Sequence, residues 1–403
     1  MATIHEYQTS TGGTKYEVRY RTPDRRTTRK RGFASKRQAN DWAAEVEVGK
    51  RSGTYVSPSA GKITVGELGP AWLKRHRGHM KPSGFRSYDS AWRIHVEPRW
   101  GRTPITAILK TDVQAWISSL ATEPTTGRKI GEDGGLGAST IETVHRVLKM
   151  ILDDAVEDRR ILANPAQRIR LPKRTAKANI YLTHEQVFAL AAEAKQYGPL
   201  ILLLCYCGPR WGEVAGLRVG HIDFLKRRIK LQENAVMVGT KVVVGTLKGH
   251  KFRDIPMPRF VGDELARVCR GKGHGDILWP SRDGGYMGPP ASLDSWLSGA
   301  VSRCIKAANE ARARETQEFG APKTPVFPRV TAHDLRHTAA SLAVKELANP
   351  KVIQRMMGHK SAAMTLDVYA DLFEDDLDLV ADRLDQAVSK MRPSTSAGSN
   401  YTA

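Results

Sequence analysis

The sequence predicts a multidomain chain: a small β-sheet with one helix, then an all-helical domain, then a larger, mainly helical domain with a small sheet. A length of 403 residues exceeds what one hydrophobic core usually serves. Apolar residues alternate near the beginning of the chain but recur at helical spacing from Thr64 onward. Linker-like stretches then divide the chain into domains at 1–60, 64–170 and 175–392, followed by a disordered tail at 393–403.

The charge balance indicates an anionic polymer as the partner. The chain has 63 Lys and Arg against 42 Asp and Glu, with a net charge of +21. No apolar run reaches the roughly 18 residues of a membrane-spanning helix, and no signal peptide follows Met1, so we expect a cytoplasmic protein without a membrane partner. The four cysteines lack a Cys-x-x-Cys pair, so we expect reduced thiols and no zinc site: Cys205, Cys207, Cys269 and Cys304.

The first sixty residues read as a three-stranded sheet with one basic face. Residues 15–21 alternate, placing Tyr16, Val18 and Tyr20 on one face and mainly charged side chains on the other. A basic strand is expected from Arg25 to Phe33, before a helix capped by Ser35. This face could simply be solvated, but a three-stranded sheet can also lie in a major groove, and the concentrated charge favours DNA. The candidate DNA-binding residues are Arg19, Arg21, Arg25, Arg26, Arg29, Lys30 and Arg31.

From Thr64 to about residue 170 the pattern predicts an all-α domain. A helix after Thr64 carries apolar residues at helical spacing, and Thr111 is expected to cap a helix that opens at Lys110. A long amphipathic helix runs from Ile141 to Val156. The basic side chains of this domain are scattered over it, as they would be on an ordinary solvent-exposed surface.

The third domain is expected to begin with a capping box formed by Thr183 and Gln186. The apolar segment 197–207 predicts a buried helix, followed by Arg210 at the mouth of the next helix. Segments 229–231 and 242–247 are expected to be strands, and Gly249 suits a hairpin turn that carries a lysine.

A set of polar residues near the end of the chain is not explained by packing. After Thr331, His333 and Arg336 are three residues apart, so on a helix they share one face and can reach the same anion. The apolar residues of this helix account for its core contacts but not for His333, Arg336 and His337. His359 and Tyr369 come later in the sequence, after the helix expected to follow Thr331.

These residues carry a family resemblance. Gly-Pro-Arg-Trp around Arg210, the His-x-x-Arg-His at 333–337, His359 after a glycine, and Tyr369 in this order resemble the tyrosine recombinase (phage integrase) family, from about residue 180 to 391. Gly-Pro-Arg-Trp replaces the commoner Gly-Leu-Arg-Ile, which removes no charged group. The N-terminal sheet is similar to the arm-binding domain of these proteins. The helical domain is similar to their SAM-like core-binding domain.

The resemblance implies a catalytic set of Arg210, Glu213, Lys248, His333, Arg336, His359 and Tyr369. Tyr369 would attack a DNA phosphate and form a 3′-phosphotyrosine, with His333 helping its deprotonation. Two arginines can stabilise the transition state without a metal, so neither metal, ATP nor other cofactor is expected. Lys248 is the expected general acid, and Lys251 remains the alternative.

The same resemblance implies a homotetramer on double-stranded DNA with core-type and arm-type sites. A host DNA-bending factor and a directionality factor are possible partners, in the nucleoid of a bacterial host. Integration of a phage or mobile element is the expected function. A type IB topoisomerase-like enzyme, a catalytically silent DNA-binding regulator and a metal-dependent nuclease are the alternatives. The acidic helix expected at 371–391 is either solvated or docks on a neighbouring subunit.

Overall fold

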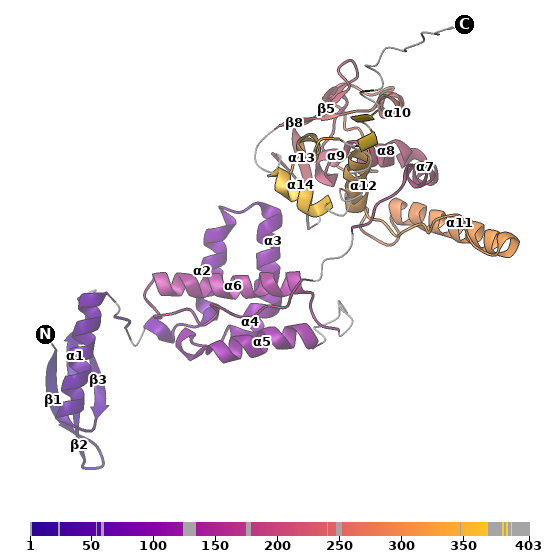
Figure 1. The fold of residues 1–403 in the computed structure, drawn as a ribbon. Helices are drawn as coiled ribbons and strands as arrows, with labels where there is room; N and C mark the ends of the chain where they lie inside the picture. The colour runs from indigo at the N-terminus through magenta and orange to yellow at the C-terminus, as the bar shows by residue number, and fades with distance from the viewer. Residues whose placement is uncertain are drawn as a thin grey trace, which may run out of the picture. The chain divides into compact units, whose positions relative to one another are not determined.

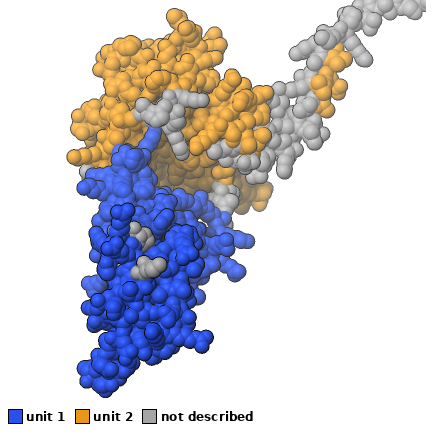
Figure 2. All heavy atoms as spheres, turned by 90° about the vertical axis from the view of Figure 1, so that its left-hand side faces the viewer, with its two compact units in different colours: residues 1–176 blue, residues 177–403 orange. Residues whose placement is uncertain are grey.

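The chain forms two compact units, residues 1–176 and 177–403 (Figure 2). The computed structural model describes residues 2–22, 25–53, 55–57, 60–123, 134–174, 179–239, 241–246, 252–346 and 348–369, and five positions between 381 and 388. Within the first unit, residues 1–60 and 63–171 have separate apolar cores. The predicted domain boundary near residue 60 is compatible with these two cores and stays a prediction.

The N-terminal part is an antiparallel sheet in the order β1-β2-β3, with α1 along it (Figure 1). The inward face of β2 buries Val18 and Tyr20 against Ala39 and Val46 of the helix, which confirms the predicted alternation. Ser35 caps the helix, its side chain accepting from the backbone N–H of the third helical residue. The elements are β1 (Thr3–Gln8), β2 (Thr14–Arg21), β3 (Thr27–Phe33) and α1 (Lys36–Ser52).

The rest of the first unit is helical, as predicted, around a core that includes Trp72, Trp92 and Trp100. Thr64 forms a capping box at the start of its helix. The helix opens at Lys110 as predicted, but the prediction that Thr111 caps it is wrong, because Thr111 is its second residue and Leu109 precedes it without a side-chain cap. The elements are η1 (Ala60–Lys62), α2 (Val65–Arg77), α3 (Pro82–Ala91), η2 (Trp92–Val96), α4 (Glu97–Trp100), η3 (Ile105–Ala107), α5 (Lys110–Thr122) and α6 (Ala138–Glu157).

In the second unit, α7, α10 and α12 pack against α8, most of whose residues are buried. Thr183 and Gln186 form the predicted capping box at the start of α7. The helices are α7 (His184–Glu193), η4 (Lys195–Tyr197), α8 (Gly198–Cys207), α9 (Trp211–Ala215), η5 (Val219–His221), α10 (Arg259–Cys269), α11 (Trp296–Phe319), α12 (Ala332–Lys345), α13 (Pro350–Met357) and α14 (Ala362–Tyr369).

Two small sheets accompany these helices. One has the order β4-β5-β8, and the other pairs β6 with β7. The predicted strand at 242–247 is observed one residue earlier, whereas its partner β6 was missed by the sequence analysis. Leu247 to Lys251, including the expected hairpin turn and both candidate lysines, lie outside the described residues. The strands are β4 (Ile222–Asp223), β5 (Arg228–Leu231), β6 (Glu233–Val238), β7 (Lys241–Thr246) and β8 (Arg253–Pro256).

The end of the chain is described only up to Tyr369 and at five later positions, which are helical. The expected acidic helix at 371–391 therefore lies mostly outside the described residues, and the tail at 393–403 lies wholly outside them. Among the described helices, none is long and apolar enough to cross a bilayer.

Candidate active site

Four segments of the second unit bring together the predicted catalytic residues that the structure describes, whereas Lys248 lies outside the described residues. Gly208 ends α8 in the left-handed conformation, and Arg210 then precedes the first residue of α9. His333 and Arg336 lie on α12, which starts at the Thr331 capping box. The other two members, His359 and Tyr369, follow α13 and lie on α14, respectively.

The two guanidinium groups are held by the C-terminal ends of two helices. Arg336, whose exposed fraction is 4%, donates to the carbonyl oxygens of Gly208 and Met357. Arg210 donates from Nη2 to the carbonyl oxygen of Gly358 over 2.8 Å. Carbonyl groups at helix C-termini carry partial negative charge and suit cations. Burial and the charge of Arg210 lower the pKa of Arg336 to about 9, which leaves it charged at neutral pH.

Glu213 joins Arg210 to a third arginine. Its buried carboxylate, 2% exposed, accepts from the Arg210 backbone N–H at 2.7 Å and from Arg210 Nη1 at 3.0 Å. Arg253 of β8 donates to both carboxylate oxygens, over 2.7 and 2.8 Å. Burial alone would raise the pKa of Glu213, but the hydrogen bonds and charge of Arg253, with those of Arg210, lower it below the ordinary value. An ionised Glu213 therefore orients Arg210.

Arg253 had no role in the sequence analysis. It lies 40 residues from Glu213, so no local spacing relates the two. Gly358, in the left-handed conformation, lets the backbone after α13 approach Arg253 closely. A Cβ at position 358 would come within 2.8 Å of the Arg253 guanidinium. The sequence signal available for Arg253 was its position two residues after Lys251, next to the segment that carries both candidate lysines.

Tyr369 is fully buried, with 0% of its surface exposed. Its hydroxyl is hydrogen-bonded to Nδ1 of His337 over 3.0 Å. The structure therefore places His337, and not His333, beside the Tyr369 hydroxyl: the His333 ring lies edge-on against His337, with 4.6 Å between ring centroids. The expected role of His333 in deprotonating Tyr369 stays a prediction. His337 is one helical turn further along α12, and α14 places Tyr369 beside that turn.

His359 is tied to the same segment as Tyr369. Its Nδ1 is hydrogen-bonded to the Thr365 hydroxyl over 2.8 Å, and its ring is stacked beside that of Tyr369, with 6.5 Å between centroids. Burial, then the charge of Arg336, lowers the pKa of His359 to about 4. Burial, then His333, lowers the pKa of His337 to about 4. Both imidazoles are therefore neutral at neutral pH, and the arginines supply the positive charge of the site.

The N-terminal sheet presents a separate basic surface, which we call the outer face: the side of β2 and β3 away from α1. Arg19 and Arg31 donate to the buried carboxylate of Glu17 over 2.7 and 2.6 Å. The strand register puts Arg29 opposite Arg19 on the same face, and Arg21 opposite Thr27. Arg25 and Arg26 precede β3.

Lys30 does not lie on this outer face. The register pairs it with Val18, which faces the helix, and its ammonium lies 4.7 Å from the centroid of the Trp42 ring of α1. Alternate residues of a strand point to opposite faces, so Lys30 points away from its neighbours Arg29 and Arg31. The structure therefore separates Lys30 from the outer face, and its predicted DNA-binding role stays a prediction.

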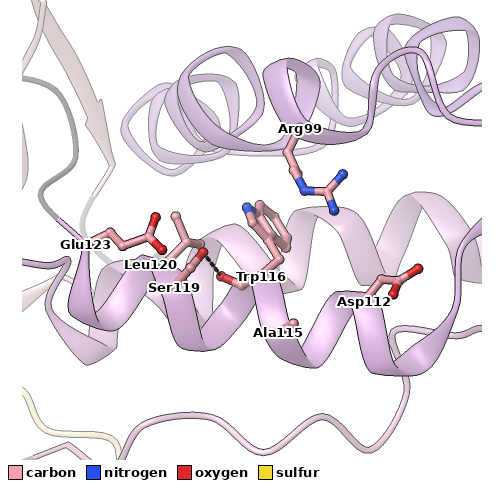
Figure 3. Close-up of a pocket in the computed structure, with 7 residues that line it drawn as sticks. All are labelled: Arg99, Asp112, Ala115, Trp116, Ser119, Leu120 and Glu123. Carbon is pink, nitrogen blue, oxygen red and sulfur yellow. Dashed lines mark hydrogen bonds between the residues drawn. The ribbon is translucent and has the colours of Figure 1, made fainter.

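Of two hollows in the described residues, one reaches the site and the other does not. One of about 530 Å³, in the first unit, lies between α4 and α5, where Arg99 faces Trp116 and the rim carries Asp112 and Glu123 (Figure 3). It contains none of the predicted site residues. Another, of about 440 Å³ and largely apolar, reaches His333 and is lined by Trp211.

Among the described residues, no group of three or more His, Cys, Asp or Glu is placed to hold a metal ion.

Comparison with known proteins finds two family matches. Residues 180–375 match the model of the phage integrase family, and residues 6–49 match an arm DNA-binding domain. The integrase of Mycobacterium phage L5 is 24% identical over 314 residues, which cover 76% of this chain and 75% of that protein.

Solved structures show the same fold. The Tn1549 transposon integrase in complex with a circular intermediate DNA aligns with a TM-score of 0.62 at 23% identity, over 80% of this chain and 99% of that one. The λ integrase tetramer bound to a Holliday junction aligns with a TM-score of 0.52 at 16% identity, over 89% of this chain and 96% of that one. With Arg210, His333, Arg336, His359 and Tyr369 gathered at one site, this chain belongs to the phage integrase family of tyrosine recombinases.

Proposed function

We propose that this recombinase integrates a phage or other mobile element into a bacterial chromosome, and that Tyr369 is its nucleophile. The observation that carries the proposal is the convergence of Arg210 and Arg336 on the C-terminal end of α13, with the buried Tyr369 hydroxyl bound to His337 of the same site. Excision of the element by the same chemistry belongs to the proposal.

The geometry suits transfer of a DNA phosphodiester to a phenol. Arg210 and Arg336 bind the non-bridging oxygens and stabilise the charge of the five-coordinate transition state. His333 and His359 donate hydrogen bonds to the same phosphate. The Tyr369 oxygen attacks phosphorus, the bond to the 5′ oxygen breaks, and a 3′-phosphotyrosine forms. In the proposal Lys248, with Lys251 as the alternative, protonates the departing oxygen.

The ester bond to Tyr369 retains the free energy of the broken linkage. A 5′-hydroxyl from another strand can therefore reseal it without ATP, and the two arginines do the work that a metal ion does in other phosphoryl transfers. Because every step is a transesterification, the proposed reaction needs no cofactor. Strand exchange follows when the resealing hydroxyl comes from a second duplex.

The proposed partners are core-type DNA sites for the helical and C-terminal parts and arm-type sites for the N-terminal sheet. We propose assembly as a homotetramer, by analogy with the λ integrase tetramer on a Holliday junction. A host DNA-bending factor and a directionality factor complete the proposed assembly in the bacterial nucleoid. The net charge of +21 supports a DNA partner.

Strand exchange tests the proposed function directly. The probes are two duplexes of unequal length that carry the repeated core sequence flanking the gene, incubated with the full chain in excess EDTA. We expect products of recombinant length and a covalent protein–DNA species on a denaturing gel. Relaxation of supercoiled plasmid without recombinant products would instead indicate topoisomerase activity, and loss of all products in EDTA would indicate a metal-dependent enzyme.

The outer face of the N-terminal sheet gives a second prediction. Arg21→Gln, which removes one charge from this face, should flatten the log-log salt dependence of arm-site binding by about 0.9 if that charge contacts a phosphate. Lys30→Gln is the matched control, because it removes the same charge from the side that faces Trp42. The measurement is a binding titration against salt on arm-type and core-type duplexes. Equal slopes for both variants and the unchanged protein would contradict DNA binding through this face.

A further inference from the structure

The hydrogen bond between Tyr369 and His337 has no part in the reaction as proposed so far. It joins Nδ1 of His337 to the hydroxyl of the buried tyrosine over 3.0 Å. We propose that His337, rather than His333, is the general base that takes the Tyr369 proton during DNA cleavage. This inference rests on the proposed role of Tyr369 as the nucleophile.

The helix that binds the phosphate also delivers this imidazole. Arg336 and His337 are consecutive on α12, so their side chains leave the helix about 100° apart. The arginine reaches the ends of α8 and α13, whereas the histidine reaches α14. Two neighbouring residues of α12 therefore serve different groups: Arg336 faces the proposed phosphate site, and His337 faces the nucleophile Tyr369.

Tyr369 is held in place by more than this contact. The link between His359 and Thr365 fixes the start of α14, and the Tyr181 ring lies against Tyr369 with 6.2 Å between centroids. With no exposed surface, the hydroxyl is shielded from bulk water in this state. A protein group in hydrogen-bond contact is therefore better placed than solvent to take the proton.

The groups around His337 favour its neutral form. Burial and then His333 lower its pKa to about 4, while Asp334 acts in the opposite direction and Arg336 in the same one. The α14 neighbour Tyr369 is uncharged, because burial raises the pKa of its phenol. A neutral imidazole can use Nδ1 as acceptor, and the high pKa of the phenol makes a base necessary. A phosphate bound at Arg336 would offset that charge and raise the basicity of His337 when the reaction occurs.

The step balances without any added reagent. The bond from the Tyr369 oxygen to phosphorus forms as the bond to the 5′ oxygen breaks. The phenol proton passes to His337 Nδ1, and the departing oxygen takes a proton from the general acid. In resealing, a 5′-hydroxyl attacks, and His337 returns its proton to the departing phenolate.

The test uses His337→Asn in the full chain with a core-type duplex. An Asn side-chain oxygen can accept near the Nδ1 position but cannot take up the proton. We expect single-turnover adduct formation to slow by about 10²- to 10⁴-fold. Hydroxide must then remove the proton, so the variant's rate should rise about tenfold per pH unit between roughly pH 6 and 8, where the unchanged protein's rate is nearly flat.

His333→Asn is the comparison variant on the same helix. It should lose rate without gaining this pH dependence, because the proposed role of His333 is a hydrogen bond to phosphate. A flat profile for His337→Asn, or the same steep profile for both variants, would overturn the proposal.

A measurement that does not depend on activity guards against misfolding of the variant. In ¹⁵N-histidine-labelled protein, Tyr369→Phe should shift the Nδ1 resonance of His337, because the phenol no longer donates to it. An unchanged resonance would also overturn the proposal. If Tyr369→Phe still forms a covalent adduct, the nucleophile assignment itself fails, which is a different outcome from either of these.

Discussion

We expect that replacing Tyr369 by Phe will abolish the covalent protein–DNA adduct and leave DNA affinity nearly unchanged. The substitution removes the attacking oxygen and keeps the buried ring between His359 and Tyr181. The lost hydrogen bond to His337 should cost about 1 kcal/mol of folding stability, so the variant should remain folded. The adduct is measured on a denaturing gel with an end-labelled core duplex, and affinity by a binding titration.

Tyr181→Phe is the matched control for this variant. It removes the hydroxyl of the neighbouring tyrosine, whose ring contacts Tyr369, and should leave adduct formation in place. Persistence of the adduct in Tyr369→Phe, or its loss in Tyr181→Phe alone, would contradict the assignment of the nucleophile.

Arg336→Lys should lower the cleavage rate by about 10²- to 10³-fold, although the charge is conserved. The guanidinium donates to two carbonyl oxygens at once, at the ends of α8 and α13, and still has donors for a phosphate. A lysine ammonium cannot reproduce this planar set of donors. One buried carbonyl left unpaired would also destabilise the fold by about 1–3 kcal/mol.

Single-turnover cleavage and thermal unfolding measure the two effects of Arg336→Lys separately. Arg267→Lys is the control, because Arg267 lies exposed on α10 and pairs with Glu264 rather than with the site. It should change neither quantity appreciably. Cleavage by Arg336→Lys at the rate of the unchanged protein would show that only the charge at this position matters.

Much of the fold could be predicted because its signals are local. The predicted capping box at Thr183 involves residues three apart, and the alternation in β2 is a property of one strand. The predictions that failed depended on context. Thr111 lies within the first turn of α5, so it cannot cap that helix from outside, and β6 was missed although its strand partner was identified.

The position of Lys30 shows a different kind of limit. Lys30 was grouped with the neighbouring basic residues because of its charge. Consecutive side chains of a strand, however, point to opposite faces of the sheet. Applying that rule within β3, as was done within β2, would have separated it from Arg29 and Arg31. The aromatic contact with Trp42 then accounts for a lysine on the helix side, since its ammonium lies over the ring.

The sequence by itself determined the order of the functional groups and the helices that carry them. Arg210, His333, Arg336, His359 and Tyr369 could be named because their motifs are short. Only the tertiary structure decided which atoms meet: His337 rather than His333 at the tyrosine, Arg253 on Glu213, and backbone carbonyls beneath both arginines. These contacts join residues from 21 to 148 positions apart, and they depend on how α8, α12, α13 and α14 pack rather than on any period within one helix.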